Sequence, residues 1–291
     1  MCDNDCIKPI EIESDLCTDG ERCFKVSSLQ QLYATSPVPI SIETPESSEL
    51  ELMRKLLAEF LGTMLLLIVV ASSGIMAEKL STDVGIQLLQ NAISTCGGLT
   101  GLILMFGPVS GAHFNPVVSL IDFLHSDMSC KDLILYTVMQ VSGAIVGALI
   151  SNIQFQVRFE LSTKERNTSN LWLSEVIGTA TLLLLIHSCV RTGRVSVVPF
   201  AVGGWICGGY FFTSSTIFAN PAVTIGRMFT NTFSGIEPRS AGIFIAFQLV
   251  GCFVGYLLIR LFYPRKITMR KDDNLYMRVC IKDIESSNIC K

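Results

Sequence analysis

Charged residues are scarce in this sequence of 291 residues. Asp, Glu, Lys and Arg make up 16% of the chain, whereas hydrophobic residues make up 49% and the mean hydropathy is +0.49. The composition argues against a water-soluble globular domain, whose surface carries more charge. The sequence contains no basic patch with interleaved aromatic residues and its net charge is −3, so we expect no nucleic-acid partner.

Motifs for catalysis and metal binding are also missing. Outside the apolar segments the sequence has no Ser/His/Asp or Cys/His set and no phosphate-binding glycine loop. The 11 cysteines include no Cys-x-x-Cys spacing, so we expect no enzyme, no cofactor and no metal site. Six cysteines lie in tails that we expect below to be cytoplasmic, where reducing conditions disfavour disulfides: Cys2, Cys6, Cys17, Cys23, Cys280 and Cys290.

Six long apolar stretches occupy most of the chain. They are centred on residues 56–77, 84–106, 131–152, 171–190, 195–216 and 241–263. Each approaches the roughly 20 residues with which a tilted helix crosses a bilayer. The sequence therefore predicts an all-α membrane protein with six transmembrane helices.

Polar tails flank the apolar region. Residues 1–50 are mildly acidic and contain no apolar run of the kind that marks a cleaved signal, so we expect a disordered tail, with a second tail over 265–291. Basic residues cluster before the first span, between the fourth and fifth, and after the sixth: Arg54, Lys55, Arg191, Arg194, Arg265, Lys266, Arg270 and Lys271. Because such clusters mark the cytoplasmic side, both termini should be cytoplasmic, and we expect the plasma membrane.

The same short signal occurs twice in the apolar region. Asn115-Pro116-Val117 and Asn220-Pro221-Ala222 each place a preferred helix N-cap before a preferred first helical residue. The segments before them, 107–112 and 213–216, look irregular, being rich in Gly or in Ser and Thr. About ten helix-compatible residues follow each box, too few to cross a bilayer, so each box predicts a half-helix.

Other landmarks repeat in the same order. Glu59, Gly62 and Thr63 recur as Glu175, Gly178 and Thr179, and Gln140, Gly143 and Gly147 recur as Gln248, Gly251 and Gly255. Each half of the domain 51–264, namely 51–155 and 170–264, holds three spans, so the second half must be inverted relative to the first. The half-helices then enter from opposite faces and their N-termini meet near the midplane. The glycine pairs predict close helix contacts.

The meeting point has a defined chemistry. An N-cap Asn accepts an N–H of its own helix through its side-chain oxygen, which leaves its NH2 group free. Asn115 and Asn220 should therefore offer donors to a neutral molecule with lone pairs, while the positive ends of the half-helices repel cations. Irregular backbone at this depth must line a path or be buried in protein.

Residues 51–264 resemble the aquaporin family, the major intrinsic proteins. The segments Ser110 to Val117 and Phe218 to Val223 are similar to the two family signatures. The resemblance implies one pore per subunit, built from six spanning helices and two half-helices, a homotetramer among membrane lipids, and passive transport. It also implies that Asn115 and Asn220 are the central donors.

The resemblance assigns three further residues, and two roles stay open at each. His113 lines the cytoplasmic half of the path or packs inside the loop. Glu59 and Glu175 hold the pore loops or carry protons, as carboxylates do in pumps. Their matched placement in the two halves favours holding.

The sequence departs from the family pattern at the selectivity filter. Val223 follows the second box where most members have Arg, and family spacing puts the other filter positions at Thr95, Gly208 and Ile217. This set is small and carries no fixed charge, so we expect a wide filter. The second signature is closest to that of bacterial channels associated with arsenic resistance, which carry an Arg four positions on, as at Arg227. Arg227 either reaches back toward the vestibule or extends to the membrane interface, and we favour the interface.

These observations predict a passive channel for water and small uncharged solutes, namely glycerol, urea and neutral metalloid hydroxides. A proton-coupled secondary transporter is an alternative, and Glu59, Glu175 and His187 are its few candidate titratable groups. A junctional or adhesive protein of the same fold is another, although the loops are short. Asn167 starts a glycosylation sequon in the outward loop, and Ser36 and Thr44 precede prolines as candidate phosphorylation sites.

Overall fold

The computed structural model describes residues 14–16, 22–24 and 45–264. Its helices are α2 Pro45–Leu80, α3 Val84–Ser110, α4 Pro116–Leu124, α5 Cys130–Phe155, α6 Ser169–Arg191, α7 Val198–Phe212, α8 Pro221–Gly226 and α9 Pro238–Phe262, with 3-10 turns η1 Val195–Val197 and η2 Arg227–Phe229. In this part of the chain 6 helices are long and apolar enough to cross a membrane, which confirms the predicted spans. The tails beyond these residues, with Ser36, Thr44 and the predicted disorder there, lie outside the described residues.

Residues 1–50 and 51–291 form two separate units. In the first unit β1 Ser14–Leu16 pairs with β2 Arg22–Phe24 in an antiparallel ladder that sets Ser14 opposite Phe24. Six residues of the tail predicted to be disordered are therefore paired. A two-stranded ladder of this size is marginal by itself in water, so it adds no folded domain.

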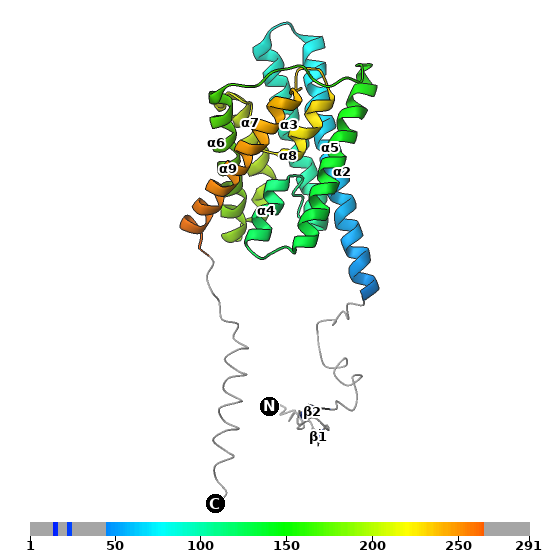
Figure 1. The fold of residues 1–291 in the computed structure, drawn as a ribbon, viewed down its shortest axis with the longest axis vertical. Coiled ribbons are helices and arrows are strands. Elements are labelled where there is room, and N and C mark those ends of the chain that lie inside the picture. The colour runs from blue at the N-terminus through cyan, green and yellow to red at the C-terminus, as the bar shows by residue number, and fades with distance from the viewer. Residues whose placement is uncertain (1–13, 17–21, 25–44, 265–291) are drawn as a thin grey trace, which may run out of the picture. The chain divides into compact units, whose positions relative to one another are not determined.

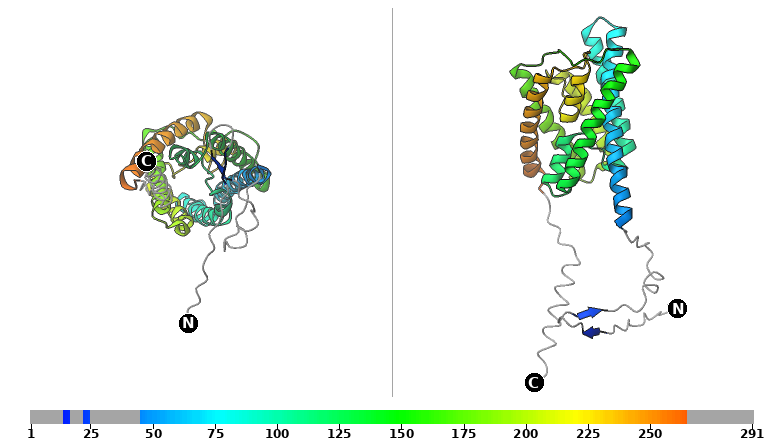
Figure 2. Two further views of the ribbon diagram at one scale, coloured as in Figure 1. Left: turned by 90° about the horizontal axis from the view of Figure 1, so that it is seen from below. Right: turned by 45° about the vertical axis from the view of Figure 1, so that its right-hand side comes forward.

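The second unit is a bundle of two repeats, α2 to α5 and α6 to α9. The long helices form a ring when seen along the bundle (Figure 2), and α4 and α8 lie inside it (Figure 1). We call the end at which α2 begins and α9 ends the terminal end, and the other the distal end. Figure 1 places α4 toward the terminal end and α8 toward the distal end, which is the inverted arrangement predicted from the repeat.

Glycines let the helices of each repeat approach closely. A Cβ added at Gly143 of α5 would lie 2.3 Å from the carbonyl oxygen of Phe60 in α2. A Cβ at Gly251 of α9 would lie 2.7 Å from the carbonyl oxygen of Val176 in α6. Neither gap admits a methyl group, so the predicted close contacts are confirmed in both repeats.

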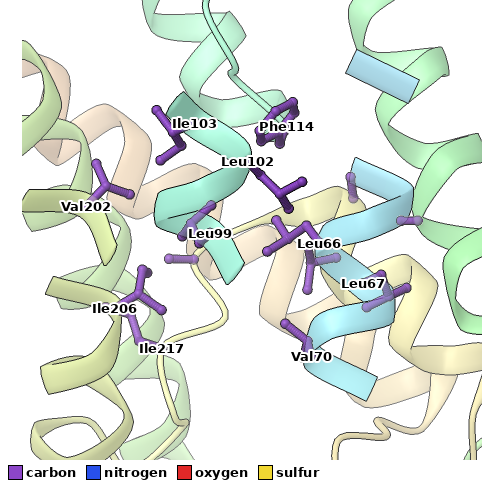
Figure 3. Close-up of a cluster of buried hydrophobic side chains, with 14 of the residues drawn as sticks. Leu66, Leu67, Val70, Leu99, Leu102, Ile103, Phe114, Val202, Ile206 and Ile217 are labelled. Atoms are coloured by element: carbon purple, nitrogen blue, oxygen red, sulfur yellow. The ribbon is translucent and has the colours of Figure 1, made fainter. Parts of the chain in front are cut away.

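A cluster of apolar side chains lines the space between α2, α3, α7 and the loops before α4 and α8. Side chains of these segments project toward one another (Figure 3), and those labelled there are Leu66, Leu67, Val70, Leu99, Leu102, Ile103, Phe114, Val202, Ile206 and Ile217. Large apolar side chains such as Ile93, Met105 and Phe253 are instead exposed on the outside of the long helices. An exposed apolar surface of this kind suits contact with lipid.

The end of α3 differs from the sequence-based expectation. Residues 107–110, expected to be irregular, continue α3 with Pro108 inside the helix. In a membrane helix, neighbouring groups can provide hydrogen-bond partners for the backbone groups that a proline leaves unpaired, so the helix can continue through Pro108. The helix ends instead at Gly111, whose φ of 87° only glycine adopts readily and whose N–H donates to the Gly107 carbonyl oxygen.

Candidate pore

Each Asn-Pro box caps a half-helix as predicted. The Asn115 side-chain oxygen accepts a hydrogen bond from the Val117 N–H at 3.1 Å. The Asn220 side-chain oxygen accepts from the N–H groups of Ala222 at 3.0 Å and Val223 at 3.2 Å. With Pro116 and Pro221 in the first helical position, the start of each half-helix is fixed by local chemistry.

The two boxes are also joined to each other. Asn115 Nδ2 donates to the carbonyl oxygen of Ala219 at 2.8 Å, and Asn220 Nδ2 donates to the carbonyl oxygen of Phe114 at 2.8 Å. The expectation that each NH2 group is wholly free is therefore wrong, because one N–H of each is engaged across the repeat interface. One N–H per amide is left for a passing molecule.

The loops before the boxes have matching backbone strain. Phe114 and Ala219, which precede the two Asn residues, have φ values of 48° and 46°, and Ala112 and Ile217, two residues earlier, have 50° and 46°. Such angles cost of order 1–3 kcal/mol for a residue with a side chain. The surrounding structure must hold these loops in place.

Glu59 holds the first loop. Its carboxylate, fully buried in α2, accepts hydrogen bonds from the N–H groups of His113 at 3.0 Å and Phe114 at 2.8 Å. Ser110 Oγ donates to it at 2.6 Å and Gln140 Nε2 at 2.8 Å. Four donors satisfy the carboxylate, so its charge is balanced by fixed dipoles.

Glu175 holds the second loop in the same way. Its fully buried carboxylate accepts from the N–H groups of Phe218 at 3.0 Å and Ala219 at 2.9 Å. Ser215 Oγ donates at 2.6 Å and Gln248 Nε2 at 2.7 Å. Neither Glu175 nor its counterpart in α2 lines the cavity described next, which supports holding over proton transfer.

A cavity of about 840 Å³ passes both boxes. Its walls include Arg191, at the terminal end of α6, both Asn side chains, and Tyr210, near the distal end of α7. Irregular backbone inside a membrane is tolerated only where it is buried in protein or lines a cavity, and the loops before the two boxes line this one. Of the residues predicted from the sequence, the cavity wall contains Asn115, Asn220, His113, Thr95, Ile217 and Val223.

Gly208 does not line this cavity. It is exposed on α7, whereas Val202, Ile206 and Tyr210, spaced four apart, are buried and face the cavity. Residues four apart share one helix face, and a residue two positions away lies on the opposite face. In this stretch of α7 the cavity wall is thus formed by Ile206 and Tyr210, and the spacing of apolar residues in α7 was the signal for this face.

Tyr210 adds a phenol to the part of the wall that contains Thr95. Its hydroxyl lies 3.0 Å from Thr95 Oγ1, and both side chains are buried. The two hydroxyls form a polar edge on α3 and α7. Ile217 and Val223 contribute apolar wall to the same cavity.

Arg227 also lines the cavity. It is only 4% exposed, its Nε donates to the carbonyl oxygen of Ser234, and its Cζ lies 3.4 Å from the centroid of the Phe218 ring. The favoured prediction that this side chain extends to the membrane interface is wrong. The ring and the carbonyl, which the sequence does not reveal, hold it inside the protein.

A polar cluster lies toward the terminal end of the cavity. His113 Nε2 is 3.1 Å from Asp122 Oδ2 of α4, and His113 Nδ1 is 3.0 Å from Ser119 Oγ. His187 Nε2 is 3.8 Å from the other Asp122 oxygen. His113, Asp122 and His187 all line the cavity, so His113 is part of the wall and its ring also contacts α4. Asp122 belongs to no motif of the sequence, although it lies seven residues after Asn115 and hence on the same face of α4.

Comparison with known proteins agrees with this geometry. The family model described as major intrinsic protein matches residues 46–216. The chain is 40% identical to the aquaglyceroporin AqpS of Rhizobium meliloti (strain 1021), over 77% of this chain and 96% of that protein. It is 26% identical to the glycerol uptake facilitator protein of Streptococcus pneumoniae (strain ATCC BAA-255 / R6), over 66% of this chain and 89% of that protein.

A solved structure has a similar fold. The X-ray structure of the aquaglyceroporin from Plasmodium falciparum superposes with a TM-score of 0.60 at 21% sequence identity, covering 75% of this chain and 97% of that one. The match supports the arrangement of six spanning helices. With a family model that covers more than half of the chain, the protein belongs to the major intrinsic protein family, whose members are membrane channels and not enzymes.

Proposed function

We propose that this integral membrane protein is a passive channel for water and small uncharged solutes, with glycerol and urea among them. The observation that carries the proposal is the reciprocal bonding of Asn115 and Asn220 beside a continuous cavity. Each amide keeps one N–H for a solute, and these two donors can replace part of the hydration of a neutral molecule with lone pairs.

The half-helices supply a barrier to ions at the same place. The N-termini of α4 and α8 both lie at the Asn boxes, and each carries about half a positive charge. At an effective dielectric constant near 20, a cation about 5 Å from the combined charge meets a penalty of roughly 3 kcal/mol. A neutral solute meets no such penalty, so the arrangement favours neutral cargo.

The wall between Thr95 and Val223 suits an amphipathic solute. The hydroxyls of Thr95 and Tyr210 offer hydrogen bonds on one part of the wall, and Ile217 and Val223 offer aliphatic surface elsewhere in the same wall. Glycerol has hydroxyls along one edge of an apolar carbon chain, which matches such a wall. Neutral metalloid hydroxides, which also carry several hydroxyls, belong to the same proposed class.

The proposal extends to the membrane location, the oligomeric state and the roles of Asn167, Glu59 and Glu175. We assign the channel to the plasma membrane as a homotetramer among lipids, with the terminal end of the bundle facing the cytoplasm. Asn167 is exposed in the loop 156–168 at the distal end, where it is available as a glycosylation acceptor. Glu59 and Glu175 act as loop supports, because each carboxylate already accepts four hydrogen bonds.

A swelling assay on purified protein in liposomes tests the proposal. We expect the protein to accelerate the flux of glycerol and urea as well as water, in proportion to the gradient and without a proton gradient. Protein-free liposomes are the control. Flux of water alone would contradict a filter that admits larger solutes, and saturable, proton-driven flux would indicate the transporter alternative instead.

A further inference from the structure

The guanidinium group of Arg227 lies on the same wall of the cavity as Val223. The two residues are four apart, so they share one face of the segment formed by α8 and η2, and both line the cavity. An advance of four residues along a helix is roughly 6 Å. The backbone of Arg227 therefore lies about one turn beyond that of Val223, and its guanidinium packs on the Phe218 ring in the loop before α8.

Neutral groups hold this charge. Ser234 contributes a carbonyl oxygen and Phe218 contributes the face of its ring. Within residues 14–16, 22–24 and 45–264, no carboxylate forms a salt bridge with Arg227. A buried cation without an ion-pair partner is costly to keep, which makes it a candidate for function.

The guanidinium also has hydrogen-bond donors to spare. An arginine carries five N–H bonds, and the Nε–H of Arg227 is used by Ser234. In the described part of the chain no other residue accepts a hydrogen bond from this group. The two NH2 groups are therefore available to water or to the oxygens of a solute in the cavity.

We infer that Arg227 is a specificity-determining residue of the pore, which repels cations and donates hydrogen bonds to neutral solutes. This inference rests on the proposed function, since it requires the cavity to conduct. Because the charge belongs to a residue one turn beyond Val223 and is held against the Phe218 ring, position 223 adds only an apolar side chain to the wall while the path keeps a positive barrier. The inference thus assigns clearance for larger solutes to Val223 and exclusion of ions to Arg227.

Arg166 provides a matched control. Its Cζ lies 5.2 Å from the centroid of the same Phe218 ring, and its Nε donates to the Gly235 carbonyl oxygen at 3.1 Å. It is half-buried and does not line the cavity. Arg166 thus shares the charge and the aromatic contact of Arg227 but lacks its place in the wall.

The test measures proton and sodium leak together with glycerol flux in the same proteoliposomes. We expect Arg227→Gln to raise cation permeability by roughly a hundredfold, the effect of removing one charge about 5 Å from the path at an effective dielectric constant near 20. Glycerol flux should change far less than cation leak, because glutamine keeps one NH2 donor for the solute and a neutral solute meets no charge barrier. Arg227→Lys, which keeps the charge, and Arg166→Gln should leak no more than the wild type.

Several outcomes would overturn the inference. Unchanged cation leak in Arg227→Gln with normal glycerol flux would show that the charge is no barrier, while leaving the proposed function intact. Equal leak in Arg166→Gln and Arg227→Gln would indicate a loosened loop instead of a lost charge. If Arg227→Gln does not reconstitute, Arg227→Met, whose apolar side chain fills the same space, carries the same expectation for cation leak. Absence of glycerol flux in the wild type would count against the proposed function alone.

Discussion

Asn115 and Asn220 are joined by a reciprocal pair of hydrogen bonds, in which each amide donates to the carbonyl oxygen of the residue before the other at 2.8 Å. The bonds lock the N-termini of two half-helices against each other. The remaining donor of each amide thereby keeps a fixed position beside the cavity. The two repeats are thus tied together by the same groups that we assign to solute contact.

Replacing Asn220 by Asp tests this double role. Asp is as good an N-cap as Asn, so α8 should still form. The substitution removes the N–H donated to Phe114 and places a carboxylate beside that carbonyl oxygen. Losing a hydrogen bond and gaining repulsion should lower glycerol and water flux by about tenfold. Asn115→Asp should have the same effect, because the two hydrogen bonds are equivalent. Flux is measured by stopped-flow light scattering, and normal flux in both variants would refute the double role.

Replacing Gly143 by Ala tests the close contact of α5 with α2. A Cβ at this position would lie 2.3 Å from the Phe60 carbonyl oxygen, so the helices must separate, which should destabilise the fold by about 1–3 kcal/mol. Gly97 of α3 is the control, because nothing lies within 4 Å of a Cβ there. Gly97→Ala should leave the melting temperature in detergent equal or raise it. Equal effects of the two substitutions would argue against a specific contact.

Replacing Glu175 by Gln separates support from proton transfer. One carboxylate oxygen accepts from the Phe218 N–H and the other from the Ala219 N–H, so a glutamine, which has an NH2 group in place of one oxygen, leaves one of these buried donors without an acceptor. We expect a loss of about 2–4 kcal/mol in the free energy of unfolding and a fall in flux at every pH. Thermal unfolding and flux measured across pH 5 to 8 check this. Normal stability with loss of a proton-driven component alone would support the transporter alternative.

Substitutions at Gly208 and Tyr210 of α7 should affect solute flux differently. Gly208→Ala should leave flux unchanged, because the added methyl group meets only Phe212, at 3.8 Å. Tyr210→Ala removes a phenol from the cavity wall together with its bond to Thr95. This variant should admit polyols larger than glycerol, measured by swelling against a series of solutes. If Gly208→Ala instead blocks glycerol, the filter position lies where family spacing puts it.

The sequence predicts those parts of the molecule that local chemistry determines. Apolar length indicates the six spans, and the Asn and Pro residues of each box indicate where a half-helix begins. The spacing of Glu59 and Glu175 predicts the inverted repeat. These features need no knowledge of neighbouring elements.

Features that depend on tertiary packing are not predictable in this way. Which face of α7 meets the cavity depends on the rotation of the helix against α3, so family spacing indicates Gly208 where the structure has Tyr210. The direction of Arg227 depends on the Phe218 ring in the loop before α8 and on the Ser234 carbonyl in the loop after η2. The bond from Asn115 to Ala219 likewise joins residues far apart in sequence.

The glycerol reflection coefficient of the protein-mediated pathway tests the central claim most directly. It compares the osmotic water flow driven by glycerol with that driven by an impermeant solute in the same proteoliposomes. Because we place water and glycerol in one path beside Val223, the coefficient should fall clearly below one for the wild type and return toward one in Val223→Arg, with water flow less affected. A coefficient of one for the wild type would contradict the account.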